Sequence, residues 1–317
     1  MKVGIFCHNG LGDAVNSLIL SYNLVQNGHE ADVYHNGVEL MKEWYPHLKP
    51  FHYPQRDEIP KIFPAYDKIV IFHNDVSEFV HELIAEGKKT CPEKVHVIYA
   101  YPSVKVYKEP YYEDCNFDPK IPIAENLYRF CRGILKLEKV EKSNGITPPG
   151  KEVHKKHPKR VVMHITSSRP GKNWPIEKFV KLALHLEKKG YTSSFVCGSP
   201  KDRKGWEWLE EQGFHLPSFQ GIGDLAAFLY ESGYFVGNDS GLGHLASSMG
   251  IPTLTLARRM TFSRFWRPNF CAGKAVVPYK WIPNISGFRL RDRKWKQFIT
   301  VNRVLREFDR LLSEEKV

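Results

Sequence analysis

The chain begins Met1-Lys-Val-Gly-Ile-Phe-Cys-His-Asn-Gly-Leu-Gly-Asp13, and this stretch decides the fold class. The apolar run Val3–Cys7 predicts a strand, and apolar residues at helical spacing over Ala14–Gln26 predict a helix after it. Gly28 is the expected end of that helix, and Ala31–His35 has the pattern of a second strand. A strand, a helix and a strand in this order are typical of parallel strands joined by right-handed crossovers.

The same alternation continues in both halves of the chain. The polar, basic stretch Glu141–Arg160 contains Pro148-Pro-Gly150 and is interpreted as a linker. We therefore predict an α/β protein of two doubly wound domains, residues 1–150 and 151–317, facing each other across a cleft, with a last helix free to pack back on the first domain. The expected strands are Lys68–Phe72, Val95–Tyr99, Val161–Ile165, Tyr191–Cys197, Tyr234–Val236 and Thr253–Leu256. The expected helices are Val76–Ala85, Pro175–Lys189, Lys201–Gln212, Asp224–Glu231, Leu242–Met249 and Leu290–Leu312.

Size and composition agree with this organisation. A chain of 317 residues is about two domains long. With 42% hydrophobic and 26% charged residues, it has enough apolar material for packed cores. No apolar run reaches the roughly 18 residues of a membrane helix, and the first apolar run is too short for a signal peptide. The six cysteines form no CxxC pair, so reduced thiols in a cytoplasmic protein are expected.

The chain has an excess of positive charge, which indicates an anionic partner. Lys and Arg number 46 against 35 Asp and Glu, a formal net charge of +11. The main basic stretch, residues 257–296, interleaves cations with Phe, Tyr and Trp. It is compatible with a solvated face, with nucleic-acid binding, or with attraction to anionic lipid and phosphorylated sugars. We favour the third interpretation.

The first candidate motif, His8–Asp13, follows the first predicted strand. Gly10 and Gly12 allow a tight turn and a close approach of the backbone to a ligand. Ligands of open parallel sheets bind at the carboxyl ends of strands. Asp13 is therefore either a helix cap or a general base that projects toward a ligand.

Two further motifs open helices in the second half. In Thr166–Pro175, the hydroxyl groups, Lys172 and free helix N–H groups together indicate an anion site. In Gly237–Ala246, the small residues keep the helix entrance open to a phosphate. His244 lies one turn into that helix and is either a donor to the same anion or a buried core residue.

Together these motifs, in this order, resemble those of glycosyltransferase family nine, the lipopolysaccharide heptosyltransferases of GT-B fold. The resemblance implies an N-terminal acceptor-binding domain, a C-terminal nucleotide-sugar domain, and inverting transfer of a heptose from an ADP-heptose to a lipopolysaccharide core. It implies Asp13 as the catalytic base, with Gly10 and Gly12 on the acceptor side. The donor-binding residues that it implies are Thr166, Ser167, Lys172, Asp239, Ser240, Gly241 and His244.

The expected ligands follow from these assignments. The sequence contains no D-x-D, the motif that holds a metal-bound diphosphate in the other common transferase architecture, so we expect neither a metal nor a cofactor. The expected partners are a nucleotide-sugar donor, an anionic glycolipid acceptor and the inner face of the cytoplasmic membrane, without nucleic acid. Two alternatives stay open. One is another nucleotide-sugar enzyme of the same fold, which uses a different donor sugar or is a hydrolase or epimerase, and the other is a basic nucleic-acid-binding module.

Overall fold

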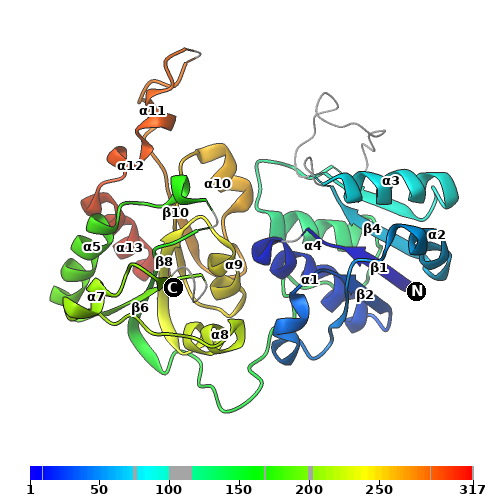
Figure 1. Ribbon diagram of the computed structural model, residues 1–317, viewed down its shortest axis with the longest axis horizontal. Coiled ribbons are helices and arrows are strands. Elements are labelled where there is room, and N and C mark those ends of the chain that lie inside the picture. Colours follow the sequence, from blue (N-terminus) through cyan, green and yellow to red (C-terminus); the bar gives the residue numbers. More distant parts are fainter. Residues whose placement is uncertain are drawn as a thin grey trace. The chain divides into compact units, whose positions relative to one another are not determined.

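The computed structural model describes residues 1–8, 10–73, 77–99, 116–167, 169–198, 203–285 and 287–315. It divides into two units, Met1–Thr147 and Pro148–Val317 (Figure 1). Each unit contains one sheet of five parallel strands. The α/β class and the parallel strands expected from the sequence are thus present in both units.

The first sheet has the strand order β3-β2-β1-β4-β5. Helices α1 and α4 pack together on one face, and α2 and α3 pack together on the other (Figure 1). Its strands are β1 (Lys2–Phe6), β2 (Glu30–Tyr34), β3 (Lys49–Phe51), β4 (Lys68–Phe72) and β5 (Val95–Ile98). Its helices are α1 (Leu11–Gln26), α2 (Ile59–Ile62), α3 (Glu78–Thr90) and α4 (Ile123–Gly133), with 3₁₀ turns at Val38–Trp44, Arg56–Glu58 and Phe63–Ala65.

The second sheet has the strand order β10-β9-β8-β6-β7. Helices α5 and α13 pack together on one face, and α8 and α9 on the other (Figure 1). Its strands are β6 (His157–His164), β7 (Thr192–Val196), β8 (Ser232–Asn238), β9 (Thr253–Leu256) and β10 (Gly273–Val276). The helices are α5 (Ile176–Lys188), α7 (Trp208–Glu211), α8 (Ile222–Tyr230), α9 (Gly241–Ser248), α10 (Met260–Trp266), α11 (Leu290–Arg293), α12 (Trp295–Phe298) and α13 (Val301–Glu315), with a 3₁₀ turn at Pro170–Lys172.

Two expected helices are wrong. The continuous helix over Leu290–Leu312 is instead three helices, α11, α12 and α13. The chain is extended at Ile299, and the Ile299 carbonyl accepts hydrogen bonds from the Trp174 indole (3.0 Å) and from Lys178 Nζ (2.9 Å). A continuous helix would use that carbonyl within itself. The first two residues of the helix expected at Lys201–Gln212 lie outside the described ones. Among the described residues this helix is interrupted at Gly205, which adopts a φ of +93°, and α7 follows at Trp208–Glu211.

Other boundaries differ less. The expected linker is too long, because its last residues, His157–Arg160, belong to β6. Arg160 is held there by stacking on the Phe228 ring, 3.9 Å from its centroid. Val76, the expected start of one helix, lies outside the described residues, and α3 begins at Glu78 with Ser77 as its cap. The sequence reasoning missed several elements altogether: β3, α2, α4, α10, β10 and the 3₁₀ turns.

The apolar face of α13 belongs to the core of the second unit. Val304, Leu305, Phe308 and Leu311 are buried in one cluster with residues of α5, β6 and β9. Phe308 also makes edge contacts with Tyr191 and Tyr234, with ring centroids 5.5 and 5.3 Å apart. Although α13 carries many charges, its buried face holds it to the sheet.

Five cysteines, all but Cys115, lie among the described residues, and each is a free thiol. Burial raises the pKa of the Cys7 and Cys131 thiols to about 12, so both stay protonated at neutral pH. Within the described ranges, we find no helix with the length and apolarity needed to cross a bilayer.

The packing of Phe308 is testable. We expect Phe308→Ala to lower the free energy of unfolding of the second unit by about 3–5 kcal/mol, because a fully buried ring is removed and a cavity remains. Guanidinium unfolding followed by tryptophan fluorescence measures this, since six of the seven tryptophans lie in the second unit. The control is Asn302→Ala on the exposed side of α13, for which we expect a change within about 0.5 kcal/mol. An equal loss in both variants would contradict the assigned packing.

Candidate active site

The expected donor-binding residues lie at one place on the second sheet. Strand β6 pairs with β7 on one side and with β8 on the other, with His164 beside Gly237. The chain passes from β6 to β7 and reaches β8 later, so the strand order reverses between β6 and β8. In open α/β sheets, ligands bind at the carboxyl ends of strands at such a point. The loop 165–175 leaves β6 there, and the loop 239–240 leaves β8.

The side chain of Asn238 joins these two loops. Its amide nitrogen donates to the carbonyls of His164 (3.3 Å) and Ile165 (2.9 Å), and its Oδ1 accepts from the backbone N–H of Trp174 (2.8 Å). Asn238 is 1% exposed, so these hydrogen bonds are shielded from water. The end of β8 and both ends of the loop after β6 are therefore fixed relative to one another.

An ion pair crosses between the loops. Lys172 Nζ lies 3.0 Å from Asp239 Oδ2, with side chains 39% and 17% exposed. The structure thus brings together two residues that the family resemblance assigns to donor binding and that lie 67 positions apart. Because Lys172 is partly exposed, its ammonium group can also contact an anion placed above the pair.

The amino end of α9 adds hydrogen-bond donors beside this pair. Ser240 is the residue before the helix, but its hydroxyl makes no capping bond and instead lies 2.9 Å from His164 Nδ1. Helix N–H groups that lack a capping side chain, together with the helix dipole, favour an anion. The glycine at position 241 keeps this entrance free of a side chain.

The hydroxyl groups after β6 stabilise the loop. Thr166 Oγ1 accepts from the Gly198 N–H (3.0 Å), and the Ser167 hydroxyl lies 2.6 Å from Asn173 Oδ1. The loop that carries Lys172 is thus tied internally and to the end of β7. This gives Thr166 and Ser167 positions at the site and a structural task within it.

His244 is buried rather than exposed at the helix entrance. It is 5% exposed, and burial lowers its pKa to about 4, against the opposing effects of the Asp239 charge and a Trp266 backbone hydrogen bond. The imidazole is therefore neutral at pH 7. Of the two interpretations of the sequence, the structure supports a buried histidine, which can contribute an N–H group but no charge.

Asp13 occupies the corresponding position of the first sheet. Strand β1 lies between β2 and β4, so its carboxyl end is the point where that strand order reverses. Asp13 is in the first turn of α1, and its Oδ2 lies 3.5 Å from His8 Nδ1. The residue before the helix is Gly10, so Asp13 does not occupy the capping position.

Gly10 is required by this arrangement. A Cβ atom at Gly10 would lie 2.5 Å from Asp13 Oδ2, which is closer than real contacts allow. Gly12 presents its carbonyl to the Asn16 side-chain amide at 2.6 Å. The carboxylate of Asp13 is 26% exposed and is therefore accessible to a substrate hydroxyl.

Sequence reasoning missed a pocket of 200 Å³ next to the loop that carries Lys172. It lies beyond the end of β7, and its lining is mostly apolar side chains and glycines, with Arg203 and Ser218 as the polar members. The Gly198–Thr166 hydrogen bond connects it to the loop that carries Lys172. Glycine directly after a parallel strand was an available signal. The lining residues are Cys197, Gly198, Arg203, Pro217, Ser218, Phe219, Gly221, Ile222 and Leu225.

The burial of His244 predicts a pH dependence. Its folded-state pKa lies below the ordinary value of 6.5, so the unfolded chain binds more protons and stability falls as the pH drops from about 6.5 toward 4. This group alone lowers the free energy of unfolding by about 2 kcal/mol between pH 7 and pH 5. We expect His244→Gln to reduce the pH dependence by that amount in urea titrations. The exposed His185→Gln is the control, and an equal effect of both would contradict the assignment.

Comparison with known proteins relates part of the chain to one protein family. Residues 135–270 match the model of glycosyltransferase family 9 (heptosyltransferase). The chain is 26% identical over 167 residues to lipopolysaccharide heptosyltransferase 3 of Escherichia coli K12, which is 49% of this chain and 47% of that protein. The match thus spans about half the length of the curated relative.

Solved structures share the fold over the whole chain. Escherichia coli ADP-heptose lipopolysaccharide heptosyltransferase II matches with a TM-score of 0.61 and 18% identity, covering 100% of both chains. The family 9 glycosyltransferase of Veillonella parvula matches with a TM-score of 0.68 and 15% identity, covering 99% of this chain and 97% of the other. The GT-B fold expected from the resemblance is therefore confirmed, and residues 135–270 are similar to glycosyltransferase family 9.

Proposed function

We propose that this protein is an inverting glycosyltransferase that moves a heptose from an ADP-heptose-type donor to a lipopolysaccharide core or related glycan acceptor. The observation that carries the proposal is the anion site at the β6–β8 reversal point, where Lys172, Asp239 and the amino end of α9 converge. A leaving nucleoside diphosphate needs this combination of a cation and fixed N–H donors.

Each group has a task in donor binding. The diphosphate lies above the Lys172–Asp239 pair and contacts the N–H groups at the start of α9. The mostly apolar 200 Å³ pocket beyond β7 receives part of the nucleoside. One preorganised donor at a developing negative charge typically accelerates a reaction about 10²–10³-fold. An adenine nucleotide is supported by the Escherichia coli heptosyltransferase WaaC, whose structure with ADP shares this fold.

Asp13 is the proposed general base. Its carboxylate removes the proton from the acceptor hydroxyl as that oxygen bonds to the anomeric carbon, and the bond from that carbon to the diphosphate breaks. A single displacement of this kind inverts the anomeric centre. Proton removal by a positioned base contributes about 10²–10⁴-fold to the rate. The developing charge is met by Lys172 and backbone groups, so the proposed reaction uses no metal ion or other cofactor.

The acceptor determines where the protein works. A lipid-linked acceptor is available only at a membrane surface, so we place the enzyme on the inner face of the cytoplasmic membrane as a peripheral protein. Nucleic acid has no part in this proposal, and the excess positive charge serves anionic glycolipid.

The role of Asp13 is tested by Asp13→Asn. We expect kcat with ADP-heptose and a deacylated core acceptor to fall about a hundredfold or more, because the amide cannot take the proton. The Kd for the donor stays within about twofold, because Asp13 belongs to the other unit from the donor loops. Glu43→Gln, at an exposed position of the same unit, is the control. Wild-type turnover by Asp13→Asn would refute the base assignment, and ADP release without an acceptor would favour a hydrolase.

The donor site is tested by thermal shift with ADP, GDP, UDP and CMP. A ligand that binds the native state raises its melting temperature, and we expect ADP to give the largest rise. Lys172→Met weakens ADP binding about 10- to 100-fold, because a charge-assisted hydrogen bond is lost and Asp239 is left facing the diphosphate. Lys181→Met, an exposed position on α5, should bind ADP as the wild type does. Equal ADP binding by both variants would exclude Lys172 from the site.

A further inference from the structure

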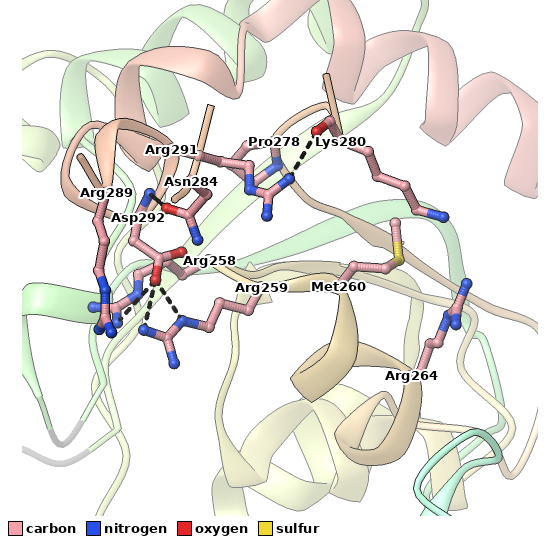
Figure 2. Close-up of a pocket in the computed structure, with 10 residues that line it drawn as sticks. All are labelled: Arg258, Arg259, Met260, Arg264, Pro278, Lys280, Asn284, Arg289, Arg291 and Asp292. Carbon is pink, nitrogen blue, oxygen red and sulfur yellow. Dashed lines mark hydrogen bonds and ion pairs between the residues drawn. The ribbon is translucent and has the colours of Figure 1, made fainter. Parts of the chain in front are cut away.

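Six of the eleven Lys and Arg residues in the basic stretch 257–296 line one pocket. This pocket lies in the second unit and has a volume of 610 Å³ (Figure 2). Its cationic residues come from four segments of the chain: the loop after β9, helix α10, the loop after β10, and the start of α11. We call it the arginine pocket. Its cationic residues are Arg258, Arg259, Arg264, Lys280, Arg289 and Arg291.

The pocket carries a large excess of positive charge. Its six cations face a single lining carboxylate, Asp292, for a formal net charge of +5. Asp292 is 7% exposed and accepts from Arg259 Nε at 2.8 Å, with Arg258 3.9 Å away. Burial raises the pKa of this carboxyl, but the Arg259 hydrogen bond and charge outweigh burial and hold it below its ordinary value. Asp292 is therefore ionised and positions two of the arginines.

The other cations are available to a ligand. The structure gives Arg264, Lys280 and Arg289 no carboxylate partner among the residues that it describes, and all three are exposed. Arg291 donates to the Lys280 carbonyl at 2.9 Å, which ties the two sides of the pocket together. An arginine guanidinium binds phosphate through two parallel hydrogen bonds, so such a cluster suits a phosphate group.

Exposed apolar side chains stand next to the pocket. The exposed fractions are 39% for Tyr279, 78% for Trp281, 68% for Ile285 and 53% for Phe288. Nine large hydrophobic residues of the described chain are exposed, and these four share one short segment. Figure 1 shows this orange segment, just before α11, extending away from the sheet of its own unit. We call these four residues the apolar rim.

A soluble phosphorylated ligand would account for the arginines but not for the apolar rim. A membrane surface accounts for both, because Trp, Tyr and Phe favour the interface while Lys and Arg are attracted to anionic headgroups. The pocket volume is also in the range of sites that enclose a small ligand. We propose that the arginine pocket and the apolar rim form a membrane-docking surface, in which the pocket binds the phosphate of an anionic lipid headgroup.

The position of this surface suits the proposed function. The role of membrane docking in catalysis rests on that proposed function. Arg258 follows β9 closely, and β9 pairs with β8, which leads into the donor loop. The Asp239 N–H donates to the Leu256 carbonyl at 3.2 Å, so the donor loop and the start of the pocket share a backbone connection. Docking by this surface would hold the donor edge of the sheet close to a lipid-linked acceptor.

The test is co-sedimentation of the full chain with vesicles, without donor or acceptor. Vesicles of phosphatidylcholine with equal phosphatidylglycerol are compared with phosphatidylcholine alone. We expect the wild type to prefer the anionic vesicles. Each cation near an anionic surface is worth about fivefold, so Arg264→Gln/Arg289→Gln should bind about 25-fold more weakly. Trp281→Ser/Phe288→Ser should also weaken binding, about tenfold or more, at unchanged net charge.

A matched variant separates the pocket from net charge. Lys181→Gln/Lys188→Gln removes two exposed cations from α5 and should bind anionic vesicles within about threefold of the wild type. Thermal melting of all variants shows whether they are folded. Equal losses in the pocket variant and the α5 variant would overturn the proposal, as would wild-type protein that does not prefer anionic vesicles.

One further outcome assigns the pocket to another ligand. If the pocket variant binds vesicles as the wild type does, but its KM rises for a phosphorylated soluble acceptor and not for the dephosphorylated one, then the pocket serves the acceptor and the membrane proposal is wrong. Vesicle binding needs no turnover, so it is independent of the proposed reaction. A chain that loses vesicle binding in the pocket variant, yet transfers no sugar, would support this inference and refute the proposed function.

Discussion

The candidate donor site depends on the hydrogen bonds of one buried amide. Asn238 pairs with two carbonyls at the end of β6 and with the N–H of Trp174, and Trp174 in turn donates its indole N–H to the Ile299 carbonyl. Each of these groups is buried, so the loss of a partner would leave a polar group without water or protein to satisfy it. The series of bonds connects the ends of two central strands, the loop that carries Lys172, and the break between α12 and α13.

This connection explains why the last helical region is interrupted. A continuous helix over Leu290–Leu312 would be favoured by local sequence, but it would remove the Ile299 carbonyl from Trp174 and Lys178. The interruption also lets Trp295 and Ile299 enter the core, where they are 3% and 0% exposed. Tertiary hydrogen bonds and burial therefore outweigh helix propensity at this point. The same contacts hold the loop of Lys172 in the position that its ion pair with Asp239 requires, which is the preorganisation that a site for developing charge needs.

Local patterns in the sequence were enough to predict those parts of the structure that depend on local periodicity. The strand–helix alternation predicted the α/β class, and glycines and small residues next to strand ends marked the loops after β1 and β8. The ion pair of Lys172 with Asp239 and the role of Asn238 depend on strands that meet only in the folded sheet, so no spacing in the sequence reveals them. The arginine pocket is similar: Arg258, Arg264, Lys280 and Arg289 are brought together by α10 and β10, which the sequence reasoning did not predict. The burial of His244 was open between two interpretations because helical position alone does not determine side-chain environment.

The two anion-binding sites inferred for the second unit share an edge because all strands of a parallel sheet end on the same side. The two sites differ in net charge, and this difference suits a nucleotide at one site and an extended anionic surface at the other. Lys172 is neutralised by Asp239 at 3.0 Å, so the loops of the proposed donor site have little net field, and a ligand there would be selected by short hydrogen bonds and shape. The arginine pocket keeps five uncompensated charges, and such a field reaches about one Debye length, roughly 8 Å, at physiological salt. An extended anionic surface responds to that field before any specific contact forms, whereas a nucleotide gains most from fixed donors at short range. We therefore expect the charged arginine pocket to provide long-range attraction to an anionic surface, and the neutralised Lys172–Asp239 pair to take part in short-range recognition of a donor.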